Sequence, residues 1–210
     1  MVVAGGPCGH SATLPAVSID AAIDSLDKAV IVAWHQGFHP AALDAVAPWW
    51  REKETWLPLY VALAAWLVWR QRWRGLFVAM AGGATVGLAD YLSAGVFKKL
   101  IGRVRPCNLE GVKEHLDLLT GCGSGLSFPS AHAANHFALA VFLSVVCFAE
   151  RRLIKWALVL WAASIAVGQV YVGRHYFSDI FAGAGLGALV GLGGALLFLR
   201  LSPKPAAPES

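Results

Sequence analysis

Five long apolar stretches alternate with short polar turns along the chain. They cover residues 55–69, 75–97, 131–148, 153–171 and 178–199. A helix needs about 20 apolar residues to cross the hydrocarbon core of a bilayer, and Trp56 and Trp69 are placed to anchor the ends of the shortest stretch at the interfaces. The pattern therefore predicts an all-α fold, a polytopic membrane helix bundle with five transmembrane helices.

The segment before these stretches, residues 19–50, mixes apolar residues with charged ones. A helix that crossed the membrane here would bury several carboxylates, among them Asp20, Asp24 and Asp27, at a cost of a few kcal/mol each. We therefore expect one or two amphipathic helices that lie in the membrane interface. A sixth span near residues 29–47 is the alternative.

Both ends of the chain have the composition of tails. Glycine, proline and serine interrupt the apolar residues of 1–18, which also lack the basic start of a secretory signal. Residues 202–210 contain three prolines. We expect a flexible tail at 1–18 and a disordered tail at 202–210, with residues 19–201 forming a single membrane domain.

The composition agrees with a membrane protein. Hydrophobic residues make up 57% of the chain, charged residues 14%, and the mean hydropathy is +0.58. Soluble domains average about 25% charged residues. The net charge of +4 is not gathered into one polar run, so nucleic acid is not an expected partner.

Positive charges in the turns predict the orientation of the bundle. If five helices alternate in direction, three basic segments fall on one side: 70–74, 150–155 and 200–204. Positively charged loops face the cytoplasm, so the long loop 98–130 and the turn 174–178 are expected to face outward. The chain is thus expected in a bacterial cytoplasmic membrane, with these two segments on the periplasmic side.

Two of the four cysteines, Cys107 and Cys122, fall in this outer loop, 15 positions apart. In an oxidising compartment they can pair, and closing a loop of this size would stabilise the fold by about 3 kcal/mol. Cys147 lies within an apolar stretch, where packing is its expected role, and Cys8 belongs to the tail. The spacing fits no zinc site, and we expect no metal.

Residues with chemical potential gather at the outer ends of the stretches in three groups. The first is Lys98 and Arg105, which are seven residues apart and therefore nearly two helical turns, with Pro106 as the expected end of the helix. Both cations can then clamp one phosphate, for which arginine offers a bidentate fork. A basic membrane edge that binds lipid headgroups is the other interpretation.

The second group, Ser130, Ala131 and His132, lies where the third stretch begins. The free N–H groups of a helix N-terminus bind anions, Ser130 adds a hydroxyl, and His132 can give or take a proton. An N-cap serine beside an interfacial histidine is the alternative. His136, one turn further, is expected to support the site or to pack.

The third group is His175 and Asp179, four residues apart and therefore on one face of a helix. A carboxylate bonded to one ring nitrogen fixes the tautomer of the histidine and leaves the other nitrogen free to act as a nucleophile. A purely structural pair is the alternative, although an ionisable pair at the end of a span favours function.

In order and spacing, the three groups resemble the signature of the type 2 phosphatidic acid phosphatase superfamily, which is shared with vanadium haloperoxidases. That signature reads Lys-x6-Arg-Pro, Pro-Ser-Gly-His and Ser-Arg-x5-His-x3-Asp. The chain departs from it at two places. Ala131 replaces a glycine, and Gly168 with Gln169 replaces the Ser-Arg pair. One of three expected cations is therefore missing, and we hypothesise that Arg174 restores the charge.

The resemblance implies a mechanism for the site. His175 would be the nucleophile that forms a phosphohistidine, Asp179 would orient it, and His132 would be the general acid and base. The donors that would hold the phosphate oxygens are Lys98, Arg105, Ser130, the N–H of Ala131, Gln169 and Arg174. Neither a metal nor a cofactor is implied.

The implied substrate is a lipid phosphate that reaches the outer helix ends from the bilayer. Undecaprenyl diphosphate, lipid A, phosphatidylglycerol phosphate and phosphatidic acid are all substrates of the family that the chain resembles. The sequence chooses none of them and leaves the oligomeric state open. Membrane lipids are the other expected partners.

Other classes of protein also fit parts of the sequence. A catalytically inactive family member that acts as a membrane scaffold or lipid-binding protein would explain Gln169, although His132, His175 and Asp179 are all present. A lipid or ion transporter would explain Asp90, which lies inside the second stretch, but we find no paired repeats of the kind that transporters show. The five apolar stretches argue against a haloperoxidase, which normally has a soluble helical body.

Overall fold

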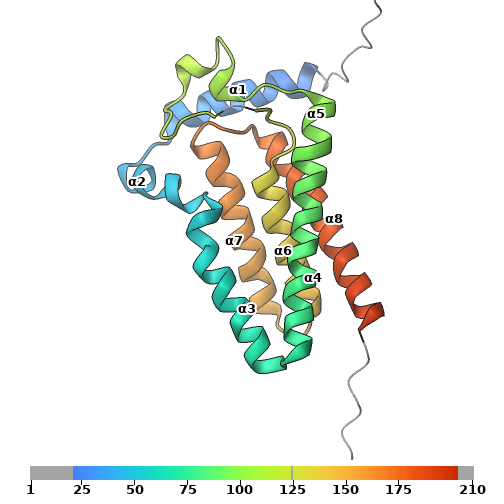
Figure 1. Ribbon diagram of the computed structural model, residues 1–210. Coiled ribbons are helices and arrows are strands. Elements are labelled where there is room, and N and C mark those ends of the chain that lie inside the picture. The colour runs from blue at the N-terminus through green and yellow to red at the C-terminus, as the bar shows by residue number, and fades with distance from the viewer. Residues whose placement is uncertain (1–20, 124, 203–210) are drawn as a thin grey trace, which may run out of the picture.

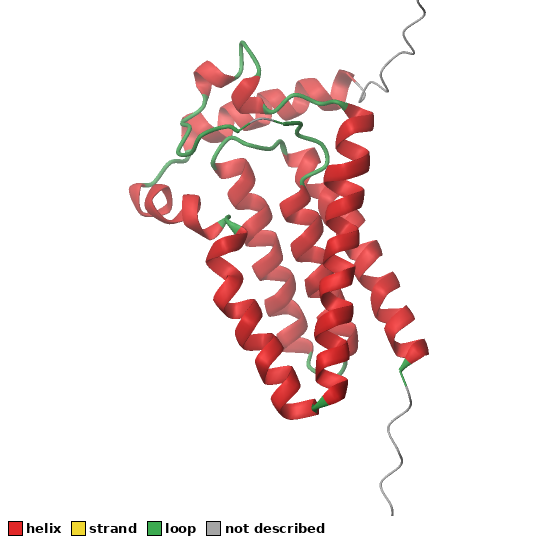
Figure 2. Ribbon diagram, viewed as in Figure 1, coloured by secondary structure: helices red, strands yellow, loops and turns green. Residues whose placement is uncertain are grey.

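The regular structure is helical throughout the residues that the computed structural model describes, 21–123 and 125–202, which confirms the predicted all-α fold (Figures 1 and 2). The predicted tail at 1–18, and all of the predicted tail at 202–210 except its first residue, lie outside these residues. The α-helices are α1 (Ala21–Gly37), α2 (Ala41–Trp50), α3 (Leu57–Gln71), α4 (Trp73–Asp90), α5 (Lys98–Ile101), α6 (Ala131–Val146), α7 (Arg152–Tyr171) and α8 (Phe177–Leu201). The shorter helical segments are the 3₁₀ turns Lys53–Trp56, Pro106–Asn108 and Lys113–His115 and the π-helical segment Tyr91–Phe97.

Five of these helices, α3, α4, α6, α7 and α8, run along one another as a bundle (Figure 1). Helix α6 packs against α4, α7 and α8, and α3 packs against α4. The π-helical segment joins α4 to α5 without a break, so Trp73–Ile101 is one helix of 29 residues. A core of buried apolar side chains, including Leu67, Phe142 and Phe198, ties α3, α6 and α8 together.

Three helices are long and apolar enough to cross a membrane: Trp73–Ile101, Arg152–Tyr171 and Phe177–Leu201. The other two predicted spans also form helices, but α3 has 15 residues and α6 has 16. At 1.5 Å per residue each is about 23 Å long, which is less than the roughly 30 Å of a hydrocarbon core. The chain is therefore a membrane-embedded helical protein with three spans by length and composition.

The N-terminal helices α1 and α2 are separate elements, and α1 lies across one end of the bundle (Figure 1). The chain leaves the helical conformation at residues 38–40, and Pro40 is the N-cap of α2. A proline disfavours helical conformation in the residue before it. The alternative of a sixth span over residues 29–47 does not hold, because no continuous helix covers that range. We call the end that α1 covers the loop end of the bundle, and the opposite end the turn end.

Small residues let α8 approach α6 closely. A Cβ atom added to Gly183, Gly187 or Gly191 would lie 2.4, 2.1 or 2.5 Å from a backbone oxygen of Ser130 or α6. These glycines therefore have the packing role that their spacing predicts. Gly83 and Gly87 of α4 have the same spacing, but a Cβ at either would meet nothing within 4 Å, so they make no such close contact.

Candidate active site

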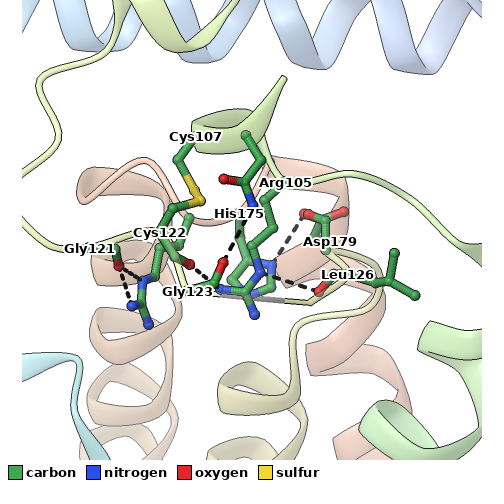
Figure 3. Close-up of a disulfide and its surroundings, with 11 residues drawn as sticks. Arg105, Cys107, Gly121, Cys122, Gly123, Leu126, His175 and Asp179 are labelled. Carbon is green, nitrogen blue, oxygen red and sulfur yellow. Dashed lines mark hydrogen bonds and ion pairs between the residues drawn. A yellow bond between two sulfur atoms is a disulfide. The ribbon is translucent and has the colours of Figure 1, made fainter. Parts of the chain in front are cut away.

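The three sequence motifs meet at the loop end of the bundle, beneath α1 and the segment 102–130 (Figure 1). The first lies at the end of α5, the second at the start of α6, and the third between α7 and α8. The ends of α5, α6, α7 and α8 thus bring the three motifs together, although the motifs are far apart in the sequence. A disulfide between Cys107 and Cys122 closes a loop in this covering segment (Figure 3).

His175 and Asp179 form the centre of the site, although they are not on one helical face as their spacing predicts. Helix α8 begins only at Phe177, and its N-cap is Tyr176. His175 Nδ1 lies 3.3 Å from Asp179 Oδ2, and the backbone N–H of Tyr176 donates to the same oxygen at 2.8 Å (Figure 3). Asp179 therefore caps the start of α8 and at the same time orients the imidazole.

Two further donors hold the carboxylate of Asp179, and the sequence analysis did not identify either. Arg103 Nη1 donates to Asp179 Oδ1 at 2.8 Å, and the Ser127 hydroxyl donates to Oδ2. Asp179 is completely buried, so these bonds and the ion pair with Arg103 offset the loss of solvation of its charge.

Arg103 connects this carboxylate to α1. Its Nη2 donates to Asp27 at 2.8 Å and to Asp24 at 3.0 Å, and its guanidinium carbon lies 4.0 Å from the centre of the Tyr176 ring. Burial alone would lower the pKa of Arg103, but the nearby carboxylates, Asp179 foremost, raise it above its ordinary value. Helix α1 thus supplies the charges that balance Arg103 beneath it.

The surroundings of His175 keep its imidazole neutral. Burial is the largest effect and lowers its pKa; the bond to Asp179 opposes this, and the positive charges of Lys98 and Arg105 add to it. The resulting pKa is about 4, below the ordinary value of 6.5. With Nδ1 facing the carboxylate, the Nε2 lone pair of a neutral ring is available to a substrate.

Lys98 and Arg105 both lie near His175, but not on a common helix. The helix ends at Ile101 because Gly102 adopts the left-handed conformation (φ 69°), four residues before Pro106. Arg105 follows in extended backbone, and its guanidinium donates to the carbonyls of Cys122 at 3.3 Å and Leu126 at 3.4 Å (Figure 3). The prediction of two cations on one helical face is therefore wrong, although their charges meet at His175.

Helix α6 begins with a capped N-terminus and a buried histidine in its first turn. Ser130 is the N-cap, and its hydroxyl accepts a hydrogen bond from Ala133 N at 3.4 Å. His132 Nε2 is buried and has no hydrogen-bond partner within the described residues. His136 is fully engaged, because it lies 2.7 Å from the His132 carbonyl and 2.9 Å from the Tyr60 hydroxyl. His136 therefore supports His132, whose own Nε2 remains available.

A tight turn presents His175 at the end of α7. Gly173 has a left-handed φ of 74°, and a Cβ atom there would lie 2.7 Å from the Leu118 side chain. The next residue, Arg174, uses Nε and Nη2 to bind the carbonyl of Gly121 in the covering loop, with the Nε bond at 2.9 Å. Arg174 thus holds the loop through Nε and Nη2.

Gln169 is buried in α7 and bound to Arg51, a residue that the sequence analysis did not consider. Arg51 Nη1 donates to Gln169 Oε1 at 2.9 Å, and Gln169 Nε2 donates to the Arg51 carbonyl at 3.1 Å. Both the oxygen and the nitrogen of the Gln169 side-chain amide therefore bind Arg51. No local sequence signal pointed to this pair, because 118 positions separate its members.

An apolar groove of about 460 Å³ reaches the site from between α3, α4 and α6. Its walls are mainly aliphatic, with Leu63, Val86 and Leu139 among them, and His132 is part of its lining. Asp90 also lines it, and Asn135 donates to Asp90 at 2.8 Å. The groove therefore joins an apolar surface of the bundle to His132.

Among the described residues no group of three or more histidine, cysteine, aspartate and glutamate side chains is arranged to hold a metal ion. The sequence model of the PAP2 superfamily matches residues 73–202, which are more than half of the chain. The chain belongs to the PAP2 superfamily. The matched segment includes all three motifs, whereas Arg51 and the two N-terminal helices precede it.

Two curated relatives of this PAP2 protein are named lipid A 4'-phosphatases. The protein from Bacteroides thetaiotaomicron is 32% identical over 171 residues, which cover 80% of this chain and 74% of the relative. The protein from Porphyromonas gingivalis is 28% identical over 108 residues, which cover 51% of this chain and 45% of the relative.

Two crystal structures share the fold of this PAP2 protein. The transmembrane PAP2 type phosphatidylglycerolphosphate phosphatase from Bacillus subtilis aligns with a TM-score of 0.66 at 23% identity, over 88% of this chain and 90% of that one. LpxE from Aquifex aeolicus aligns with a TM-score of 0.61 at 24% identity, over 83% of this chain and 95% of that one.

Proposed function

We propose that this PAP2 protein is a membrane phosphatase that removes phosphate from a lipid, with His175 as its nucleophile. One observation carries the proposal: the oriented, neutral His175 lies among the cations Lys98 and Arg105, at the end of the bundle where an apolar groove reaches His132. The cations would bind the phosphate, and the groove would accommodate the apolar part of the same molecule.

The reaction would take place in two displacements at phosphorus. In the first, His175 Nε2 forms a bond to phosphorus while the bond to the leaving oxygen breaks, and His132 donates a proton to that oxygen. In the second, His132 removes a proton from a water molecule, whose oxygen attacks phosphorus and releases His175 together with inorganic phosphate. Asp179 would hold the same His175 tautomer through both steps.

Preorganised donors would bind the phosphate oxygens as their charge develops. Those expected from the motifs are Lys98, Arg105, Ser130, the N–H of Ala131, Gln169 and Arg174. Donors of this kind are worth about 3–4 kcal/mol each in the transition state. Because Gln169 already binds Arg51, its part would be smaller than that of a free amide.

A phosphate of lipid A is the first substrate to test, because both curated relatives are named lipid A 4'-phosphatases. The other candidates are undecaprenyl diphosphate, phosphatidylglycerol phosphate and phosphatidic acid. All of them combine a phosphate with long apolar chains, which the groove beside His132 would accommodate.

The proposed arrangement in the membrane is one domain, residues 19–201, with five spans and the site outside. The basic turns after α3 and α6 and the end of α8 all lie at the turn end (Figure 1), and positively charged loops face the cytoplasm. Helices α1 and α2 would then lie in the periplasmic interface of a bacterial cytoplasmic membrane. The shorter helices α3 and α6 would also cross the membrane, with their ends covered by neighbouring segments of the chain.

The test is release of inorganic phosphate from the four lipids in detergent with EDTA present, for the wild type and for His175→Ala. We expect the wild type to release phosphate from at least one lipid. The rate of release should be at least about 10³-fold lower for His175→Ala, because the nucleophile is absent. Equal rates for the two proteins would exclude a phosphohistidine route. No release from any lipid would instead favour the inactive scaffold.

A further inference from the structure

Arg51 is a charged side chain with no exposed surface. It lies between α2 and the 3₁₀ turn before α3, in contact with Gln169 near the C-terminal end of α7, and its exposed fraction is 0%. Arginine is almost never buried to this extent unless its charge is used in a pair or a binding site. This position is 22 residues before the segment that matches the family, since that segment starts at residue 73.

The partners of Arg51 leave part of its guanidinium unsatisfied. Nη1 donates to Gln169 and Nη2 to Glu52, but Nε is buried and has no hydrogen-bond partner within the described residues. Glu52 is itself partly exposed to solvent, with 38% of its side chain accessible. An unpaired N–H of a buried cation is costly, and a bound anion would remove that cost.

Both residues at which the third motif departs from the family pattern contact Arg51. The amide of Gln169 binds the Arg51 guanidinium and the Arg51 carbonyl. A Cβ atom at Gly168 would lie 3.3 Å from Arg51 Cβ, so any larger residue at 168 would crowd it. Gly168 thus leaves space for the Arg51 side chain, and Gln169 holds it by hydrogen bonds, although Arg51 lies outside α7.

The electrostatic surroundings of Arg51 are those of an anion site. Burial lowers the pKa of Arg51, the positive charges of Arg174 and Arg105 lower it further, and Glu52 only partly opposes them, so that it reaches about 10. Arg51 is also close enough to His132 for its positive charge to interact with the imidazole. The positive charges of Arg105 and Arg174 repel that of Arg51, and a phosphate bound between these groups would turn the repulsion into attraction.

We propose that Arg51 is a phosphate-binding residue of this active site, which supplies from the N-terminal region the cation that position 169 lacks. Gln169 is then the positioning residue for Arg51. This inference rests on the proposed function, because it assumes that the phosphate binds beside His132 and His175. It predicts that the charge can be moved between positions 51 and 169 with partial retention of activity.

The first measurement is orthovanadate binding to the detergent-solubilised full chain by calorimetry, since vanadate resembles phosphate and requires no turnover. We expect Arg51→Gln to weaken binding at least 10-fold, and Arg51→Lys to weaken it less, because it keeps a charge without the fork. Arg152→Gln is the matched control, since Arg152 is exposed at the far end of α7. Its affinity should equal that of the wild type.

The second measurement moves the cation, with lipid phosphate turnover and vanadate affinity as readouts. Arg51→Gln should lower kcat by about 10²-fold or more, as loss of a transition-state donor does. Gln169→Arg alone should also lower kcat, because it places a second guanidinium against Arg51. The double variant Arg51→Gln with Gln169→Arg should exceed each single variant at least 10-fold, whereas two merely structural lesions would combine to a larger loss.

The outcomes separate this inference from the proposed function. If the wild type releases phosphate and His175→Ala does not, while Arg51→Gln keeps wild-type vanadate affinity and kcat, the function stands and the role of Arg51 is refuted. Folded Arg51→Gln protein that is weakened but not rescued by Gln169→Arg would also overturn it. If the wild type neither binds vanadate nor releases phosphate, both proposals fail together.

Discussion

At the scale of single residues, the site is built from buried charges that hold one another in place. Asp179 accepts hydrogen bonds from Arg103, Ser127 and the Tyr176 backbone and faces His175 Nδ1. Arg103 in turn binds Asp27 of α1. The orientation of the proposed nucleophile therefore depends on groups from the covering segment and from the N-terminal helix as well as on its own turn.

The pKa of His175 predicts how activity depends on pH. Burial lowers this pKa to about 4, so the neutral nucleophile persists at pH 5, where a histidine with the ordinary pKa of about 6.5 would be protonated. We expect kcat/KM to keep its value down to about pH 5 and to fall below that. The pH–rate profile measures this, after correction for the second ionisation of the phosphate itself, near pH 6.

The same shift predicts the pH dependence of stability. The folded state favours neutral His175, so protons bind preferentially to the unfolded chain and stability is highest above about pH 6.5. It should decline as the pH falls from there toward 4. His175→Ala should show a smaller decline over this window in thermal unfolding. An acid limb of kcat/KM centred near 6.5 would mean that His175 titrates as an exposed histidine does.

Removing Arg103 should destabilise the fold strongly. Arg103→Met leaves the buried carboxylates of Asp179 and Asp27 without their cation, and breaking a buried pair in this way typically costs about 3–5 kcal/mol. Asp24→Asn is the control, because Asp24 is about one third exposed (32%) and exposed pairs contribute less than about 1 kcal/mol. Chemical unfolding in detergent measures both. Similar small losses for the two variants would show that the Arg103 network is not a determinant of stability.

At the scale of the elements, the close contact between α6 and α8 sets the distance between the two proposed catalytic histidines. His132 lies in the first turn of α6, and His175 directly precedes α8. Gly183, Gly187 and Gly191 line the contact. A change that separates these helices would therefore act on the site from within the membrane.

Gly187→Ala tests this dependence. Its Cβ would lie 2.1 Å from the Ala134 carbonyl oxygen, whereas a Cβ at Gly185 of the same helix meets nothing within 4 Å. We expect Gly187→Ala to lower stability by about 1–3 kcal/mol and to reduce phosphate release, and Gly185→Ala to change neither. Thermal unfolding and turnover of the two variants measure the difference. Equal behaviour would mean that α6 and α8 can separate without consequence.

At the scale of the whole molecule, the bundle has chemically different ends. The loop end carries α1, the disulfide-closed loop and the three motifs, and the turn end carries the basic turns (Figure 1). The apolar groove beside α3, α4 and α6 reaches the loop end at His132. A substrate held in the groove would thus present its phosphate on one side of the membrane only.

Cysteine labelling tests which side this is. Glu110→Cys lies in the covering loop and Arg72→Cys in the turn between α3 and α4; both would be made in a chain that lacks Cys8 and Cys147. In spheroplasts, a membrane-impermeant maleimide should label the first variant and should reach the second only after permeabilisation. The reverse pattern would place the site in the cytoplasm and overturn the proposed orientation.

The sequence by itself determined the features that depend on neighbouring residues. Five apolar stretches predicted the positions of five helices, of which three are long and apolar enough to cross a membrane. Ser130 was identified as a candidate N-cap because capping involves residues only three positions apart. The motif order also indicated the family, which the match over residues 73–202 confirmed. The end of α5 could also have been predicted from the sequence, since a glycine such as Gly102 commonly terminates a helix. The sequence analysis instead placed the end of this helix at Pro106.

Only the tertiary structure decided which distant polar side chains meet. Arg103 and Asp179 are 76 positions apart, and Arg51 and Gln169 are 118 positions apart. Neither pair has a periodic or local signature, because long-range ion pairs and hydrogen bonds depend on how helices and loops are placed and not on spacing along the chain. The sequence showed that position 169 lacks the cation of the family pattern, and the packing of α2 against α7 brings Arg51 into contact with Gln169. The physical reason is that a phosphate interacts with positive charge at a point in space, whichever segment supplies it.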